Sequence, residues 1–202
     1  MASVVQAASG NYDLVRGLRL YDTSGDLPER ARALWAIIHE DGTEMAREFW
    51  RRYAQSPEVV EPMDAAQIEQ NAARIVPYIA SRYARIDQPD WTIKAREYVE
   101  RALGNGLTLS TLLAGVSAET EAAFVALRHK VSEEAALVAH ARTLSDLQAL
   151  EVDAFIHHAI SITRVESEQA QARQAAAFNQ KVVGVVQNFT RESEQLRGQA
   201  TS

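Results

Sequence analysis

The stretch EYVERALGNGLTLS, residues 97–110, decides how this chain folds. Its first half carries apolar residues at helical spacing. The Gly-Asn-Gly run at 104–106 is typical of a helix C-terminus, since glycine readily adopts the backbone conformation that ends a helix. Apolar residues follow directly and indicate that a second helix begins. The stretch therefore predicts two consecutive helices joined by a tight turn, with Ala102 in the last turn of the first helix.

Helical patterns extend over the rest of the chain. Apolar residues recur at spacings of three and four, and there is no alternating Val/Ile/Thr run that would predict a strand. All five prolines lie at or before residue 89, where they separate segments. Gly115, within an apolar segment, indicates close packing against a neighbouring helix. The sequence predicts an all-α fold with helices over about 26–40, 43–56, 64–84, 90–104, 107–131 and from 132 onward.

The composition excludes several classes of function. The chain has 202 residues, a net charge of −6 and no cysteine. The negative charge argues against a nucleic-acid-binding surface, and the lack of cysteine excludes disulfides and thiolate ligands. No run of 18 apolar residues is present, and the first residues lack a signal-peptide pattern. We therefore expect a cytoplasmic protein without membrane insertion.

No motif of a known enzyme type is present. The chain lacks the glycine-rich loop that cradles nucleotide phosphates, the Gly-x-Ser-x-Gly nucleophile turn and the His-Glu-x-x-His zinc motif. It also lacks the Glu-x-x-His pairs that hold metals in di-iron bundles. We expect no catalytic residue, no metal site and no enzymatic activity.

The C-terminal part predicts a long helix that needs a partner. Residues 132–183 contain no glycine or proline. The first part is apolar, and we expect it to form a homodimer interface through Leu147, Leu150, Val152 and Phe155. Beyond Thr163 the segment is polar nearly all round. Apolar residues then return at spacings of three and four, which is typical of a coiled-coil seam. The seam residues are Ala175, Phe178, Val182, Val185 and Phe189.

The order of the segments and three stretches of sequence resemble the sensor globins of bacterial globin-coupled sensors, notably those of aerotaxis chemoreceptors. DWTIKAREYVERALGNGLTLSTLLAGV, residues 90–116, aligns without a gap to the family's haem-ligating helix and the apolar helix after it, with Trp91 at the leading aromatic position. AREFWRRYAQSPE, residues 46–58, resembles the family's second helix, and LSDLQALEVDAF, residues 144–155, resembles its last helix. The resemblance covers about residues 26–162 and implies a globin-like fold.

Two positions depart from the family's haem-binding pattern. The histidine that ligates the iron falls on Ala102, and the distal tyrosine falls on Trp50. Haem iron needs an axial donor such as His, Cys, Met or Tyr, which alanine cannot supply. The resemblance therefore implies a sensor globin without haem. The alternative is an oxygen or other gas sensor that keeps haem on an unusual ligand, either Tyr98 or a displaced His129.

The space that haem would occupy has two possible contents. We expect side chains to fill it, because protein interiors pack near crystal density. The alternative is a small apolar ligand, with Asn71 as its hydrogen-bonding group. The candidate residues of this pocket are Trp50, Asn71, Ile75, Tyr98, Ala102, Leu103 and Leu112.

These inferences combine into one predicted organisation. An N-terminal extension (1–25) precedes a globin-like sensor domain (26–163) and a coiled-coil linker (164–202) that leads toward an output domain. The resemblance implies a homodimer that regulates a signalling output, with chemotaxis as the pathway the family indicates, acting on a domain in cis or on chemotaxis proteins. Without the resemblance, the residues are also compatible with a non-globin helical adaptor protein.

Overall fold

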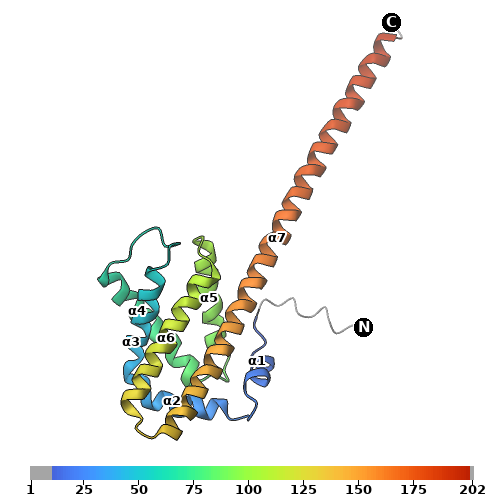
Figure 1. The fold of residues 1–202 in the computed structure, drawn as a ribbon. Coiled ribbons are helices and arrows are strands. Elements are labelled where there is room, and N and C mark those ends of the chain that lie inside the picture. Colours follow the sequence, from blue (N-terminus) through green and yellow to red (C-terminus); the bar gives the residue numbers. More distant parts are fainter. Residues whose placement is uncertain (1–10, 201–202) are drawn as a thin grey trace. The chain divides into compact units, whose positions relative to one another are not determined.

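A computed structural model of the chain describes residues 11–200, apart from the side chains of residues 177, 179 and 181–200 (Figure 1). Within this range the regular elements are helices and no strand occurs, so the all-α prediction is confirmed. The elements are α1 (Leu14–Tyr21), α2 (Leu27–Ile38), the 3-10 helix η1 (His39–Asp41), α3 (Gly42–Ala54), α4 (Ala65–Ala84), α5 (Asp90–Gly104), α6 (Leu109–Lys130) and α7 (Glu134–Ala200).

The turn between α5 and α6 has the form that the sequence predicts. Gly106, just after α5, has a φ of +77°, a left-handed conformation that favours glycine. The carboxylate of Glu58 holds the start of α6. It accepts hydrogen bonds from the backbone N–H of Thr108 at 2.8 Å and from the hydroxyl of Thr111 at 2.7 Å. The turn and this clamp fix Ala102, near the end of α5, relative to α6.

The start of α4 and the start of α5 are each held by local hydrogen bonds. Asp64 and Gln67 form a capping box, in which each side chain accepts a hydrogen bond of 2.8 Å from the other residue's backbone N–H. At the start of α5, the fully buried Trp91 donates its indole N–H to the carbonyl of Ile86 at 2.9 Å. These contacts set where the two helices begin.

The core is built around α3, which packs against both α4 and α6 (Figure 1). Gly115 in α6 permits the close approach, because a β-carbon at this position would lie only 2.7 Å from the ring of Phe49 in α3. The close packing that the sequence predicts at Gly115 is therefore confirmed. It brings the aromatic side of α3 next to the first half of α6.

The chain divides into two compact units, Met1–Ile160 and Ser161–Ser202, and α7 passes from the first into the second. The first unit also contains α1, which lies in the segment predicted as an N-terminal extension. The hydroxyl of Tyr12 donates a 2.6 Å hydrogen bond to Asp153 of α7, and Leu14 is buried. Residues 11–21 are thus packed against the helical unit.

Most of the residues predicted for a dimer interface are buried in the core of the single chain. Leu147, Leu150 and Phe155 are at most 2% exposed within the first unit, whereas Val152 is half-buried. Their side chains already pack against the chain's own helices, so the first three are not available to a second chain. The apolar spacing showed that this face is buried, but spacing does not distinguish burial within a chain from burial between chains.

The coiled-coil seam is described only in part. Ala175 is exposed and Phe178 is 66% exposed within this single chain. The side chains of Val182, Val185 and Phe189 lie outside the described residues, so the seam stays a prediction. In the part of the chain that the structure describes, no helix is both long and apolar enough to cross a bilayer.

Gly115→Ala is expected to lower the free energy of unfolding by about 1–3 kcal/mol, because the added methyl group must displace the packed ring of Phe49. Gly104→Ala, whose added methyl group meets no atom within 4 Å, is the matched control and should leave the stability unchanged or slightly raised. Chemical denaturation of both variants measures the difference. Equal effects of the two substitutions would contradict the packing at Gly115.

Candidate functional site

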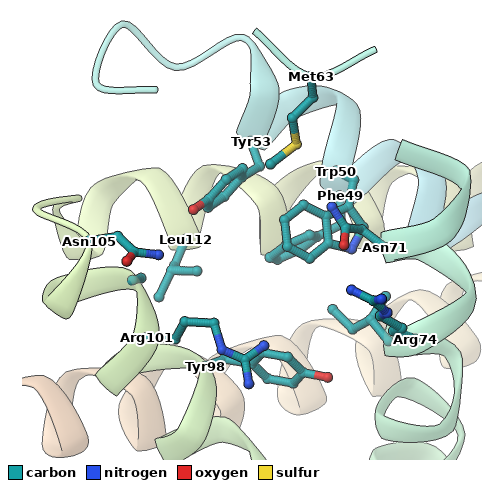
Figure 2. Close-up of a pocket in the computed structure, with 12 residues that line it drawn as sticks. Phe49, Trp50, Tyr53, Met63, Asn71, Arg74, Tyr98, Arg101, Asn105 and Leu112 are labelled. Atoms are coloured by element: carbon teal, nitrogen blue, oxygen red, sulfur yellow. The ribbon is translucent and has the colours of Figure 1, made fainter. Parts of the chain in front are cut away.

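A cavity of about 290 Å³ lies beside Ala102, between α3, α4, α5 and α6 (Figure 2). We call it the Ala102 cavity. Most of its wall is apolar or aromatic, as is usual for ligand sites in proteins. The residues that line it are Phe49, Trp50, Tyr53, Met63, Asn71, Arg74, Ile75, Tyr98, Arg101, Ala102, Asn105 and Leu112.

Helical spacing explains how three helices present their side chains to one space. On α5, Tyr98, Arg101 and Ala102 are separated by three and four residues, so they share one face of the helix. On α4, Asn71 and Ile75 are four residues apart and likewise share one face of the helix. The aromatic residues of α3 close the opposite side, where rings contact each other edge-on at 4.9–5.5 Å between centroids. The cavity is thus a product of helix periodicity and of the tight α3–α6 approach.

The structure brings together most of the residues that the sequence places in the pocket. The predicted residues that line the cavity are Trp50, Asn71, Ile75, Tyr98, Ala102 and Leu112. Leu103 is half-buried and does not line it, because it follows Ala102 on α5 and lies about 100° further round the helix. Side chains fill the space expected for haem only in part, and about 290 Å³ stays open. The aromatic rings of α3 pack against one another and against Gly115, which leaves open volume in front of Ala102.

The lining carries positive charge without a compensating acid. Arg74 and Arg101 line the cavity, and none of the lining residues is Asp or Glu. Neither arginine forms an ion pair with any of the described residues. Trp50 adds a buried indole N–H that has no acceptor among those residues. The site therefore offers two cations to whatever enters it.

The cavity does not fit haem. No histidine lines it, and its possible axial donors are Met63 and the two tyrosines. Burial raises the pKa values of Tyr53 and Tyr98, which disfavours the phenolate form that binds iron. A cavity of 150 Å³ is known to hold benzene, so about 290 Å³ holds roughly a dozen non-hydrogen atoms, several times fewer than an iron porphyrin has. His129, the other candidate ligand, is exposed near the end of α6 and lies outside the cavity.

A chain of contacts leads from the Ala102 cavity to α7. The ring of Tyr98 meets the ring of Tyr78 edge-on, with 5.3 Å between centroids. The hydroxyl of Tyr78 donates a hydrogen bond to the carboxylate of Glu151 on α7. Burial, followed by the charge of Glu151, holds the pKa of Tyr78 well above its ordinary value, so the hydroxyl keeps the proton that it donates.

Glu151 belongs to a buried ionic cluster that joins three helices. Arg82 of α4 donates to Glu151 of α7 and to Glu119 of α6, and all three side chains are at most 2% exposed. We call these residues, with Tyr78, the Arg82 cluster. Burial raises the pKa of Glu119 to about 7, the charge of Arg82 opposes this shift, and the charge of Glu151 adds to it.

The Arg82 cluster was not predicted from the sequence, although a signal for it was present. Glu151 lies four residues from both Leu147 and Phe155, within an apolar stripe, and Arg82 lies three residues after Ile79 on the apolar stripe of its own helix. A charged residue on the apolar face of a helix predicts a buried partner of opposite charge, because an unpaired buried charge is costly. The sequence does not say which of the acidic residues supplies that partner.

Arg74 and Arg101 were also missed. Each lies three residues after a predicted pocket residue, Asn71 and Tyr98 respectively, so helix periodicity was the available signal. Within the described residues, no group of three or more His, Cys, Asp or Glu side chains is arranged to hold a metal ion.

Comparisons with known proteins do not assign the chain to a family. No protein-family model, no curated protein and no solved structure matches this chain. The resemblance to sensor globins therefore rests on the residues quoted above.

The free energy of unfolding is expected to fall as the pH rises from about 4.5 to about 7. Glu119 has its pKa raised from 4.5 to about 7 in the folded chain, so the folded state binds more protons than the unfolded state in this window. Glu119→Gln keeps the side-chain shape but cannot ionise, and should flatten the dependence. Glu121→Gln, at an exposed position of the same helix, is the control and should retain it. Urea denaturation across the window measures both, and identical slopes would contradict the assignment to Glu119.

Proposed function

We propose that the chain is a haem-free sensory module in which the Ala102 cavity receives a small molecule and α7 carries the response. The observation that carries this proposal is the contact chain from Tyr98 through Tyr78 to Glu151 of α7. The resemblance to sensor globins supports it, since that family places its sensing site at the position of Ala102.

The contact chain gives a ligand a physical route to α7. A molecule in the cavity touches Tyr98. Because the rings of Tyr98 and Tyr78 pack edge-on, a rotation of the Tyr98 ring forces the Tyr78 ring to move as well. The hydroxyl of Tyr78 is bonded to Glu151, so movement of Tyr78 alters the hydrogen bonds of the Arg82 cluster. A ligand shifts α7 only to the extent that it binds two arrangements of these side chains with different affinity.

The response of α7 requires a second chain in our proposal. Phe178 is 66% exposed at the start of the predicted seam, and an apolar seam on a single helix is stabilised by a partner helix. Within the first unit, α6 and α7 carry exposed apolar residues that are available to contact a second copy of the chain. They are Phe124, Val138, Ile156 and Ile160. These residues replace Leu147, Leu150 and Phe155 as the proposed contacts of a homodimer.

The output of the module follows from the resemblance. In globin-coupled sensors the last helix leads to a signalling domain, and chemoreceptors are the members that this chain resembles. We therefore propose a cytoplasmic regulator of a signalling output, with chemotaxis as its first candidate. The site has no catalytic role in this proposal, since the cavity presents no nucleophile paired with a base.

Purification with haem supplied is expected to give a protein without a stoichiometric Soret band. The reason is that the cavity has no imidazole to ligate the iron and too little volume for a porphyrin. Absorption spectra of the purified chain, with the haem content determined by a pyridine haemochrome assay, measure this. A Soret band at one haem per chain would contradict the haem-free proposal.

Filling the cavity is expected to change the spacing of the two α7 helices in the dimer. The chain has no cysteine, so Val165→Cys, at an exposed position of α7, carries a single nitroxide label. Ala102→Leu, which adds bulk in the cavity, should shift the distance between the two labels. Pulsed electron–electron double resonance measures this distance. Tyr78→Phe removes the hydroxyl bonded to Glu151 and should reduce that shift.

One control variant and two contradicting outcomes make this experiment decisive. Ala73→Leu adds the same bulk at an exposed position of α4 outside the cavity, and should leave the distance unchanged. Absence of any inter-label distance would contradict the homodimer. An unchanged distance in the folded Ala102→Leu variant would contradict the coupling between the cavity and α7.

A further inference from the structure

We propose that the ligand of the Ala102 cavity is an aromatic carboxylate with one or two rings, whose carboxylate is held by Arg74 and Arg101. This inference deepens the proposed function and rests on it for the role of the cavity as the sensing site.

Charge determines that the ligand is an anion. The chain has a net charge of −6, and half of the arginines whose side chains the structure describes are paired with carboxylates: Arg30, Arg32, Arg47, Arg51, Arg82, Arg85, Arg96 and Arg164. Of the arginines that have no acidic partner among the described residues, Arg74 and Arg101 are the two that line the cavity. A guanidinium group matches the planar geometry of a carboxylate, and hydrogen bonds between charged groups are about twice as strong as neutral ones.

The two arginines line the same cavity from different helices. Arg74 comes from α4 and Arg101 from α5 (Figure 2). Both are exposed, so the carboxylate would remain at the mouth, where part of its hydration is retained. This arrangement avoids the cost of burying an ion and leaves the interior of the cavity for an apolar body.

The volume of the cavity and the aromatic side chains of its wall determine the apolar part of the ligand. The volume of about 290 Å³ is roughly twice that of a cavity that holds benzene, which corresponds to one ring with substituents or two fused rings. Four aromatic side chains line the space: Phe49, Trp50, Tyr53 and Tyr98. Aromatic rings gain contact energy from edge-to-face and offset packing on such walls beyond the area that they bury, which an aliphatic chain of equal volume does not.

A polar substituent on the ligand would find one polar side chain on the wall. Asn71 lines the cavity and supplies both a donor and an acceptor. A hydroxyl or ring nitrogen on the aromatic body would hydrogen-bond to Asn71, so substituted rings should bind more tightly than the plain ring.

The test uses 2-naphthoate as the probe and isothermal titration calorimetry of the full chain. We expect one site per chain, and a weakening of about tenfold or more in each of Arg74→Gln and Arg101→Gln, because each loses a charge-assisted hydrogen bond. Arg128→Gln, at an exposed position of α6 outside the cavity, is the matched control and should bind as the unaltered chain does. Ala102→Leu should abolish binding, with circular dichroism confirming that each variant is folded.

Related probes separate the parts of the inference. The neutral 2-naphthamide has the same rings without the charge, and decanoate has the charge and similar bulk without the rings, so each should bind at least about tenfold more weakly. Acetate should show no measurable binding. Absence of 2-naphthoate binding, equal binding by the amide or by decanoate, or unchanged binding in both arginine variants would each overturn the inference.

The outcomes also separate this inference from the proposed function. Binding of 2-naphthoate without any change in the distance between labels at Val165→Cys would leave the ligand assignment standing and remove the sensory role. A distance shift in Ala102→Leu together with no binding of 2-naphthoate would keep the sensory role and overturn the ligand assignment.

Discussion

The arrangement of this chain depends on one buried guanidinium. Arg82 lies between Glu119 and Glu151 with almost no exposure to water, and so ties together helices that are distant in the sequence. Such a cluster costs desolvation free energy for each ion, and its contribution to net stability is often small. Its effect is directional, because the donors of a guanidinium point along fixed lines. It sets the axial position and rotation of α4, α6 and α7 relative to one another in a way that apolar contacts alone do not.

The same cluster links the cavity to the longest helix. Tyr78 contributes its hydroxyl to Glu151 and its ring to Tyr98, so one side chain belongs to both the cluster and the wall of the cavity. The cluster carries two carboxyl groups for one guanidinium, and burial raises the pKa of Glu119 to about 7. A site built in this way has more than one arrangement of protons and hydrogen bonds available, which is the property that a coupling element needs.

Charge is distributed in opposite ways over the two sites of interest. In the Arg82 cluster acids outnumber the base, and the surroundings are closed to water. In the Ala102 cavity two bases have no acid, and the mouth is open. On an acidic chain, two arginines that lack an acidic partner among the described residues and lie beside an aromatic wall form a local attraction for anions that the net charge does not reveal.

The sequence by itself determined the helices and much of the composition of the cavity wall. Spacings of three and four, the Gly-Asn-Gly run and the positions of the prolines predicted the helical segments, because these signals act within a few residues of each other. The resemblance predicted Trp50, Asn71 and Tyr98 as pocket residues beside Ala102, since a resemblance carries tertiary information that periodicity lacks.

Only the tertiary structure decided what these helices enclose. It showed that Leu147 and Phe155 are buried within one chain, that the space beside Ala102 stays open, and that Arg82 finds Glu119 and Glu151. The physical reason is the same in each case. Periodicity fixes which face of a helix a residue occupies, but the partner of that face, the volume left between rings and the pairing of buried charges depend on how distant segments pack together.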